Sequence, residues 1–156
     1  ERLRRAGRKV TEELGLLGDQ FDVGFRSLHV ASPNMEDNLA TAEGLSQASL
    51  LASVRSVKQD RSEDDLIFQV LLAGGLDLAE AISVEHVEGT RVTSVADGAV
   101  IGCFATDLSD AAVKGMASRR PIRAVFLDSA FMSDAERINL EQTFRELSPE
   151  TEVKVI

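Results

Sequence analysis

The spacing of apolar residues along this 156-residue chain changes near its middle, from a helical period to an alternating one. In the first 17 residues, apolar side chains recur at intervals of three and four, the period of a single stripe along an α-helix. The members of this stripe are Leu3, Ala6, Val10, Leu14 and Leu17. The pattern predicts a helix that ends between Gly15 and Gly18.

Residues 21–30, FDVGFRSLHV, have an alternating pattern. The apolar positions are Phe21, Val23 and Phe25 on one face, then Leu28 and Val30 on the other. This alternation predicts a strand with a bulge or bend near Arg26. Residues 31–44 are polar and contain Pro33, which indicates a loop, and the spacing of apolar residues in 50–57 predicts a short amphipathic helix.

Ser62 precedes the next predicted helix. With Asp65 three positions later, it forms the sequence pattern of a capping box, in which each side chain bonds the backbone N–H of the other residue. Gly74 and Gly75 are placed to close this helix. The segment between these ends, LIFQVLL, is apolar nearly all round, which predicts burial on more than one side.

From Ile82 onward the pattern is that of short strands. ISVEHV and RVTSV alternate and are separated by Glu88-Gly89, while Asp97-Gly98 precedes the apolar run AVIGCFA. Asp followed by Gly is a strong signal for a tight turn between antiparallel strands. The segment therefore predicts a three-stranded meander whose last strand is buried on both faces.

After the meander, helical and strand-like segments alternate. DAAVKGMAS predicts a helix that Ser109 or Asp107 caps and Pro121 stops, and the strand AVFL, a second helix and the strand EVKVI follow. Strands joined by crossover helices pair in parallel. The predicted fold is α/β, a mixed sheet with a β-meander followed by two βαβ crossover units, with α+β as the alternative. A mainly helical N-terminal region with one strand, residues 1–61, precedes this α/β C-terminal domain, residues 62–156.

Charge and cysteine content narrow the classes of protein. The 17 basic and 26 acidic residues give a net charge of −9, which argues against a general nucleic-acid-binding surface. Basic residues nevertheless cluster at the start, where Arg2, Arg4, Arg5 and Arg8 are candidates for a DNA-proximal surface, with a solvated helix face as the favoured alternative. The single cysteine, Cys103, excludes an internal disulfide and a cysteine-based zinc cluster and fits the cytoplasm.

Other features of the chain bear on its location. No segment approaches the length of an apolar membrane span, and no signal peptide is visible, so no membrane partner is expected. Because the chain begins at Glu1 without an initiator Met, we expect a piece of a longer protein. Cys103 lies in an apolar run and is expected to be a small buried hydrophobe, not a nucleophile.

Asp107 and Asp128 follow the two predicted parallel strands, so both carboxylates are expected at one edge of the sheet. Such a pair could bind Mg²⁺ in a small metal-dependent phosphoryl-transfer enzyme. An aspartyl nucleophile normally needs a second Asp two residues on, where this chain has Ala130, and no glycine-rich phosphate loop is present. Capping or loop-anchoring roles are therefore the favoured interpretation of both residues.

The remaining candidates point to surface contacts. His29 and His86 lack ligand partners at metal-binding spacing, and Ser129 lacks a nucleophile elbow, while Ser133 with Glu136 has the spacing of a helix cap. On the last helix, Leu140, Phe144 and Leu147 share one face. The candidate protein interface lies on the opposite face and comprises Ala135, Ile138 and Gln142. The chain has no Trp or Tyr, so the usual nucleic-acid stacking platforms are missing.

Five segments, in order, carry a family resemblance. They are RRAGRKVTEELGL, FDVGFRSLHVASPNM, EDDLIFQVLLAGGLDL, IGCFATDLSDAAVKGMASRRPIRAVFLDSAF and RINLEQTFRELSPETEVKVI. Together they resemble the C-terminal part of the modification subunit of type III restriction-modification systems, over nearly all of the chain from Arg4 to Ile156. Members of this family are DNA methyltransferases that transfer a methyl group from S-adenosylmethionine to N6 of adenine.

The resemblance implies a non-catalytic domain. The family's catalytic motif, D/N-P-P-Y/F, and its cofactor motif, F-x-G-x-G, precede the matched region, and neither occurs here. No catalytic, cofactor-binding or metal-ligating residue is therefore assigned, and S-adenosylmethionine is expected only for the parent protein. The resemblance further implies a homodimer, assembly beside the restriction subunit, and contact with DNA through the parent protein. A DNA-contacting accessory module remains the other alternative.

Overall fold

The computed structural model describes residues 1–15, 23–35 and 57–156, which group into two compact units, Glu1–Ser32 and Pro33–Ile156. The boundary predicted from the sequence lies between residues 61 and 62, where the first helix of the sheet domain begins. The predicted helix over residues 50–57 and most of the predicted loop over residues 31–44 lie outside the described residues.

In the described part of the first unit there is one helix, α1 (Arg2–Leu14), which ends at Gly15 as predicted. None of the residues of α1 is buried. The strand predicted for residues 21–30 is wrong over its described part, because residues 23–30 form no strand. An alternating pattern yields a strand only where a neighbouring strand pairs with its backbone, and these residues have no such ladder among the described strands.

The first helix in the described part of the second unit is α3 (Glu63–Ala73), whose capping box is present as predicted. The backbone N–H of Asp65 donates to Ser62 Oγ at 3.2 Å, and the backbone N–H of Ser62 donates to Asp65 Oδ2 at 2.9 Å. The helix buries Leu66, Ile67, Val70 and Leu71. Phe68 and Gln69 are partly buried, whereas Leu72 is 65% exposed, so the burial predicted for this segment does not extend to Leu72. The face with the four buried residues covers the sheet.

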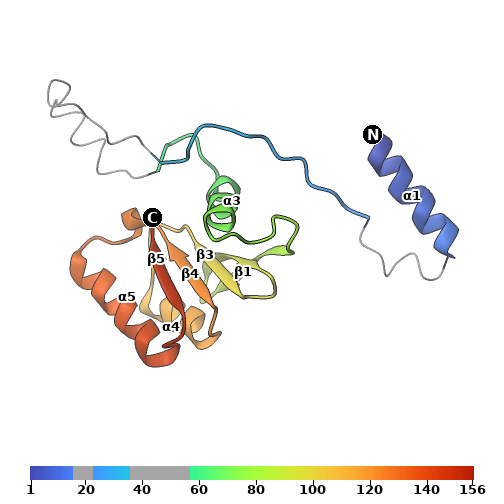
Figure 1. Ribbon diagram of the computed structural model, residues 1–156. Coiled ribbons are helices and arrows are strands. Elements are labelled where there is room, and N and C mark those ends of the chain that lie inside the picture. Colours follow the sequence, from blue (N-terminus) through green and yellow to red (C-terminus); the bar gives the residue numbers. More distant parts are fainter. Residues whose placement is uncertain (16–22, 36–56) are drawn as a thin grey trace, which may run out of the picture. The chain divides into compact units, whose positions relative to one another are not determined.

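Five strands form one mixed sheet in the order β1-β2-β3-β4-β5 (Figure 1). Their bounds are Ile82–Val87 (β1), Thr90–Val95 (β2), Val100–Cys103 (β3), Arg123–Phe126 (β4) and Glu152–Val155 (β5). The first three pair antiparallel, and β3, β4 and β5 pair in parallel. The predicted α/β fold, with a β-meander followed by two βαβ crossover units, is confirmed.

The connecting segments are α4 (Asp110–Ser118), the short 3-10 helix η3 (Asp128–Ala130) and α5 (Asp134–Leu147). Ser109 caps α4, with its Oγ accepting the N–H of Ala112 at 3.2 Å, so Asp107 is not the cap. Helices α4 and α5 cover one face of the sheet, and α3 covers the other (Figure 1). The sheet is thus the middle layer of three.

Strand β3 is buried on both faces, as predicted. Its Ile101 and Cys103 pack into the core beneath α4 and α5, whereas Val100 packs into the core beneath α3. Gly102 allows α3 to approach closely, because a Cβ there would lie 2.9 Å from Phe104 Cζ and 3.0 Å from Ile67 Cδ1. A larger residue at this position would have to displace the Phe104 ring and the end of the Ile67 side chain.

A small polar cluster fixes the turn between α5 and β5. Ser148 is buried, and its Oγ lies 2.6 Å from Thr151 Oγ1. Thr151 Oγ1 donates to the carbonyl of Pro121 at 2.5 Å, just before β4. The N–H of Glu152 then donates to the carbonyl of Ile122 at 2.9 Å and starts the ladder between β4 and β5. These bonds hold β5 as the last strand of the sheet.

We predict that Ser62→Ala lowers the free energy of unfolding by about 1 kcal/mol, because it removes the side-chain cap of α3. Urea denaturation measured by circular dichroism checks this value. Ser129→Ala, at an exposed position in η3, is the control and should change stability by less than about 0.5 kcal/mol. Equal losses for the two variants would contradict a stabilising role of the capping box.

The contribution of the Ser62–Asp65 capping box to the free energy of unfolding should depend on pH. The hydrogen bonds from the Ser62 side chain and backbone hold the pKa of Asp65 below its usual range. A carboxyl whose pKa is lowered by folding adds stability above its unfolded pKa, and this stability is lost as the pH falls through the folded value. The difference between wild type and Ser62→Ala should therefore shrink when the denaturation is repeated in acid.

Candidate functional site

The order of the strands bears directly on where a ligand could bind. In open α/β sheets, ligands bind outside the carboxyl ends of the strands, at the point where the strand order reverses and helices change face. Here β3, β4 and β5 follow one another in chain order, and both crossover helices lie on the same face. The parallel part of this sheet therefore contains no reversal of order that would open a crevice.

Asp107 and Asp128 are the two carboxylates predicted at the ends of parallel strands. Asp107 and Asp128 are both exposed. Asp128 Oδ1 lies 3.6 Å from Arg137 Nη1 on α5, and the N–H of Asp128 donates to the carbonyl of Ile156 at 2.8 Å. Among the described residues, no three His, Cys, Asp or Glu side chains are grouped so that they could hold a metal ion. Asp128 thus contacts α5 through its side chain and the residue that follows β5 through its backbone N–H.

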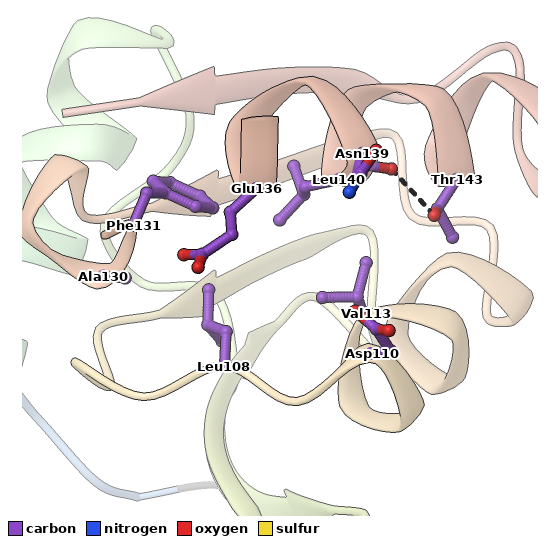
Figure 2. Close-up of a pocket in the computed structure, with 9 residues that line it drawn as sticks. All are labelled: Leu108, Asp110, Val113, Ala130, Phe131, Glu136, Asn139, Leu140 and Thr143. Atoms are coloured by element: carbon purple, nitrogen blue, oxygen red, sulfur yellow. Dashed lines mark hydrogen bonds between the residues drawn. The ribbon is translucent and has the colours of Figure 1, made fainter. Parts of the chain in front are cut away.

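The start of α5 lies beside a small hollow between α4 and α5 (Figure 2). Ser133 Oγ accepts the N–H of Glu136 at 3.4 Å, and Glu136 Oε2 accepts the N–H of Met132 at 2.8 Å, so the predicted cap is present. The hollow measures about 60 Å³. Pockets for small molecules usually have about 300 Å³ or more, so this one has room for a few water molecules and not for a substrate.

The remaining candidate residues from the sequence lie on separate elements of the chain. His29 is exposed in the first unit, His86 is exposed on β1, and Ser129 is exposed in η3. Cys103 is fully buried, and its Sγ lies 3.8 Å from the carbonyl of Arg91. Burial raises the pKa of the Cys103 thiol, which favours the unreactive protonated form. The prediction that this cysteine is a small buried hydrophobe is confirmed.

The candidate DNA-proximal residues all lie on α1. Arg2, Arg4, Arg5 and Arg8 are exposed. One ion pair joins Lys9 Nζ to Glu13 Oε1 at 3.7 Å on the same helix. Among its described residues, the unit that contains α1 also exposes seven large apolar side chains: Leu3, Val10, Leu14, Val23, Phe25, Leu28 and Val30. Basic and apolar groups are therefore both open to a partner in this unit.

The candidate interface residues lie on the face of α5 that points away from the sheet. Ala135, Ile138 and Gln142 are exposed, and the Ile138 side chain is 60% accessible. On the opposite face, Leu140 and Phe144 are buried, and the Phe144 ring packs edge-on against Phe126 at a centroid distance of 5.7 Å. The predicted division of α5 into a core face and an outer face is confirmed for these residues, although Leu147 is 38% exposed.

A groove that the sequence analysis missed runs between α5 and the last strand, and we call it the edge groove. Its volume is about 270 Å³, and it is lined by Glu141, Phe144, Arg145, Ser148, Pro149, Thr151 and Val153. Glu141 and Arg145, which carry opposite charges, line the groove from α5, and Val153 lines it from β5. Glu141 Oε1 also lies 3.6 Å from Arg137 Nε on the same helix. The signal in the sequence is the alternation in EVKVI, which is typical of a strand with one partly exposed face.

Comparison with known proteins adds no family assignment: no family model matches the chain, and no curated protein matches it. Among the described residues, the helices lack the length and apolar character needed to cross a bilayer.

We predict that Cys103 in the folded chain reacts with a thiol reagent at least on the order of 10³-fold more slowly than in denaturant, because the reaction requires unfolding. Because folding raises the pKa of the Cys103 thiol, this residue contributes its full stabilisation of the folded state below the ordinary thiol pKa of about 8.5. That contribution decreases as the pH rises above this value. With a thiol reagent that releases a chromophore, absorbance measures the rate of the Cys103 reaction.

A matched control places the thiol at the surface. The double variant Cys103→Ala, Ser129→Cys carries its only cysteine at an exposed position and should react at the rate of a free thiol without denaturant. Rapid reaction of Cys103 in the folded wild type would show that the thiol is accessible and would contradict its role as a core residue.

Proposed function

We propose that this chain is the non-catalytic C-terminal dimerisation and assembly domain of the modification subunit of a cytoplasmic type III restriction-modification system. The parent protein would be a site-specific, adenine-specific DNA methyltransferase that uses S-adenosylmethionine. The five quoted segments, which extend in order from Arg4 to Ile156, support this assignment. A sheet domain in which Asp128, one of the two strand-end carboxylates, pairs with Arg137 is compatible with it.

The observation that carries a role in assembly is the apolar surface of the first unit. Its helix α1 buries no residue, although Leu3, Val10 and Leu14 form a continuous stripe that is 38% to 62% exposed. Short helices in proteins gain most of their stability from packing of the apolar face. Exposed apolar patches on folded proteins commonly mark sites where another surface binds. This stripe is therefore suited to contact with another part of the assembly.

In this proposal the methyl transfer takes place elsewhere in the parent protein. Adenine and S-adenosylmethionine bind the region with the D/N-P-P-Y/F and F-x-G-x-G motifs, and the present domain contributes no reacting group. Its contribution is geometric, because pairing two copies places two catalytic regions in a fixed relation about one symmetry axis. The same domain offers further surface to the restriction subunit.

A second candidate role is contact with DNA through α1. The observation that favours it is the row of exposed arginines, Arg2, Arg4, Arg5 and Arg8, at the start of a chain that is otherwise acidic. Arginine binds phosphate without regard to base sequence, so such contacts would add affinity and not specificity.

The dimer proposal predicts a mass of about twice 16.9 kDa in light scattering behind size exclusion at high micromolar concentration. Titration calorimetry with S-adenosylmethionine should show no binding to this chain, because the cofactor motif is absent from it. A monomer at all concentrations would contradict self-association. Micromolar binding of S-adenosylmethionine would contradict the placement of the cofactor site in another region.

The DNA role predicts a change in the salt dependence of binding by the full-length protein. Replacing Arg2, Arg4, Arg5 and Arg8 by Gln should reduce the slope of log K against log salt by about 0.9 for each phosphate that the variant no longer neutralises. Arg91→Gln is the control, because the Arg91 Nε already lies 3.0 Å from Glu63 Oε2. An unchanged slope, measured by fluorescence anisotropy with duplex DNA, would remove the DNA role of α1.

A further inference from the structure

Among the described strands, β5 lies at one edge of the sheet (Figure 1). Its backbone pairs with β4 on one side. The N–H groups of Glu152 and Ile156 donate to the carbonyls of Ile122 and Phe126, each at 2.9 Å, toward β4. Since successive residues of a strand point their backbone groups to opposite sides, the N–H and C=O of Val153 and Val155 point away from β4. Among the described strands, β5 pairs with β4 alone. Its outer edge can therefore accept another strand.

We infer that the outer edge of β5 binds the β5 strand of a second copy of this chain, antiparallel, with Val153 facing Val153 of the second copy across the two-fold axis. The two sheets then join into one continuous sheet. This inference rests on the proposed dimerisation function and specifies the surface that performs it. Two residues that face each other in a hydrogen-bonded antiparallel pair exchange both N–H···O=C bonds, so the two Val153 residues supply the central bonds.

Charge selects this register. With Val153 on the axis, Glu152 of each copy lies opposite Lys154 of the other, in a non-hydrogen-bonded pair where side chains are closest. If one copy of β5 slid by two residues along the other, the outward backbone groups could still pair. The two Lys154 side chains would then lie opposite each other. Opposite charges facing across strands stabilise a pair, and like charges destabilise it.

The position of Glu152 is already fixed within its own copy. Arg123 donates to Glu152 Oε2 from Nε at 2.9 Å and from Nη2 at 2.6 Å. A carboxylate held in this way loses less conformational entropy when a further cation approaches it. Lys154 of the second copy would thus meet an ordered acidic group.

The edge groove provides a second match about the same axis. Glu141 and Arg145 of α5 line this groove together with Val153, so they lie at the level of the proposed axis. An antiparallel α5 from the second copy would place its Arg145 beside Glu141 and its Glu141 beside Arg145. Such an interface is isologous, since one patch is complementary to itself. Ile138, one turn before Glu141 and 60% exposed, lies at the outer margin of the contact.

The other edge of the sheet lacks this complementarity. In β1, the N–H of Ala96 donates to the carbonyl of Ala81 at 3.0 Å, so the backbone groups of Ile82, Val84 and His86 point outward by alternation. If the two-fold axis passed through Val84, Glu85 of each copy would lie opposite Ser83 of the other. If the axis passed between Val84 and His86, the Glu85 residues of the two copies would lie opposite each other. Neither register of β1 pairs opposite charges, which leaves β5 as the self-complementary edge.

The first test removes the outward N–H of Val153. Val153→Pro should weaken the dimer by about tenfold or more, because both central hydrogen bonds disappear while the ladder to β4 keeps its donors. Val84→Pro is the matched control, since it removes an outward N–H from the other edge strand, and it should leave the dissociation constant unchanged. Sedimentation equilibrium measures the constant, and circular dichroism verifies that each variant is folded.

The second test addresses the register. Lys154→Glu and Glu152→Lys should each weaken self-association, because each creates two like-charge pairs, and an equimolar mixture of the two variants should regain wild-type affinity. If Glu152→Lys does not fold because Arg123 loses its partner, Glu141→Arg and Arg145→Glu on exposed α5 follow the same logic. A mixture that associates no better than its components would overturn the proposed register.

The outcomes also distinguish this inference from the proposed function. A wild-type chain that stays monomeric would overturn both. A wild-type dimer whose dissociation constant is unaffected by Val153→Pro would overturn the β5 surface and leave dimerisation standing. A dimer weakened by Val153→Pro, insensitive to Val84→Pro and restored in the charge-swapped mixture supports the inference.

Discussion

The burial of β3 on both of its faces is the constraint that organises the second unit. Ile101 and Cys103 are completely inaccessible on one face, and Val100 is 5% exposed on the other. A strand of this kind requires a layer of helices on each side of the sheet. Helices α4 and α5 form one layer, and α3 forms the other at the short distance that Gly102 allows.

The three-layer arrangement also determines where function can lie. Because both crossover connections run in the same direction, the parallel strands β3, β4 and β5 have no topological switch point at their carboxyl ends. At one of these ends, the Asp128 side chain pairs with Arg137 of α5. The same advance leaves β5 at the margin with one side of its backbone unpaired within the described sheet. The described residues offer an exposed strand edge and a charged groove in the second unit, and the apolar stripe of α1 in the first.

Local signals predict most of the fold, but not the parts that depend on neighbours. The turns at Glu88-Gly89 and at Asp97-Gly98 define the meander, since the backbone there has the positive φ angles that such turns require. The strand predicted at residues 23–30 lacks a pairing partner among the described strands, and Leu72 faces away from the sheet. The edge groove could not be predicted either, since it requires knowing that β5 is the last strand and that Glu141 and Arg145 lie beside Val153.

Self-association through the edge of β5 can be followed at single backbone amides by hydrogen exchange and nuclear magnetic resonance, at low and at high protein concentration. We expect the Val153 amide to become protected as the concentration rises, because it then donates to the second copy. The Val84 amide on the opposite edge should continue to exchange at its original rate. A Val153 amide that exchanges equally fast at both concentrations would contradict pairing through β5.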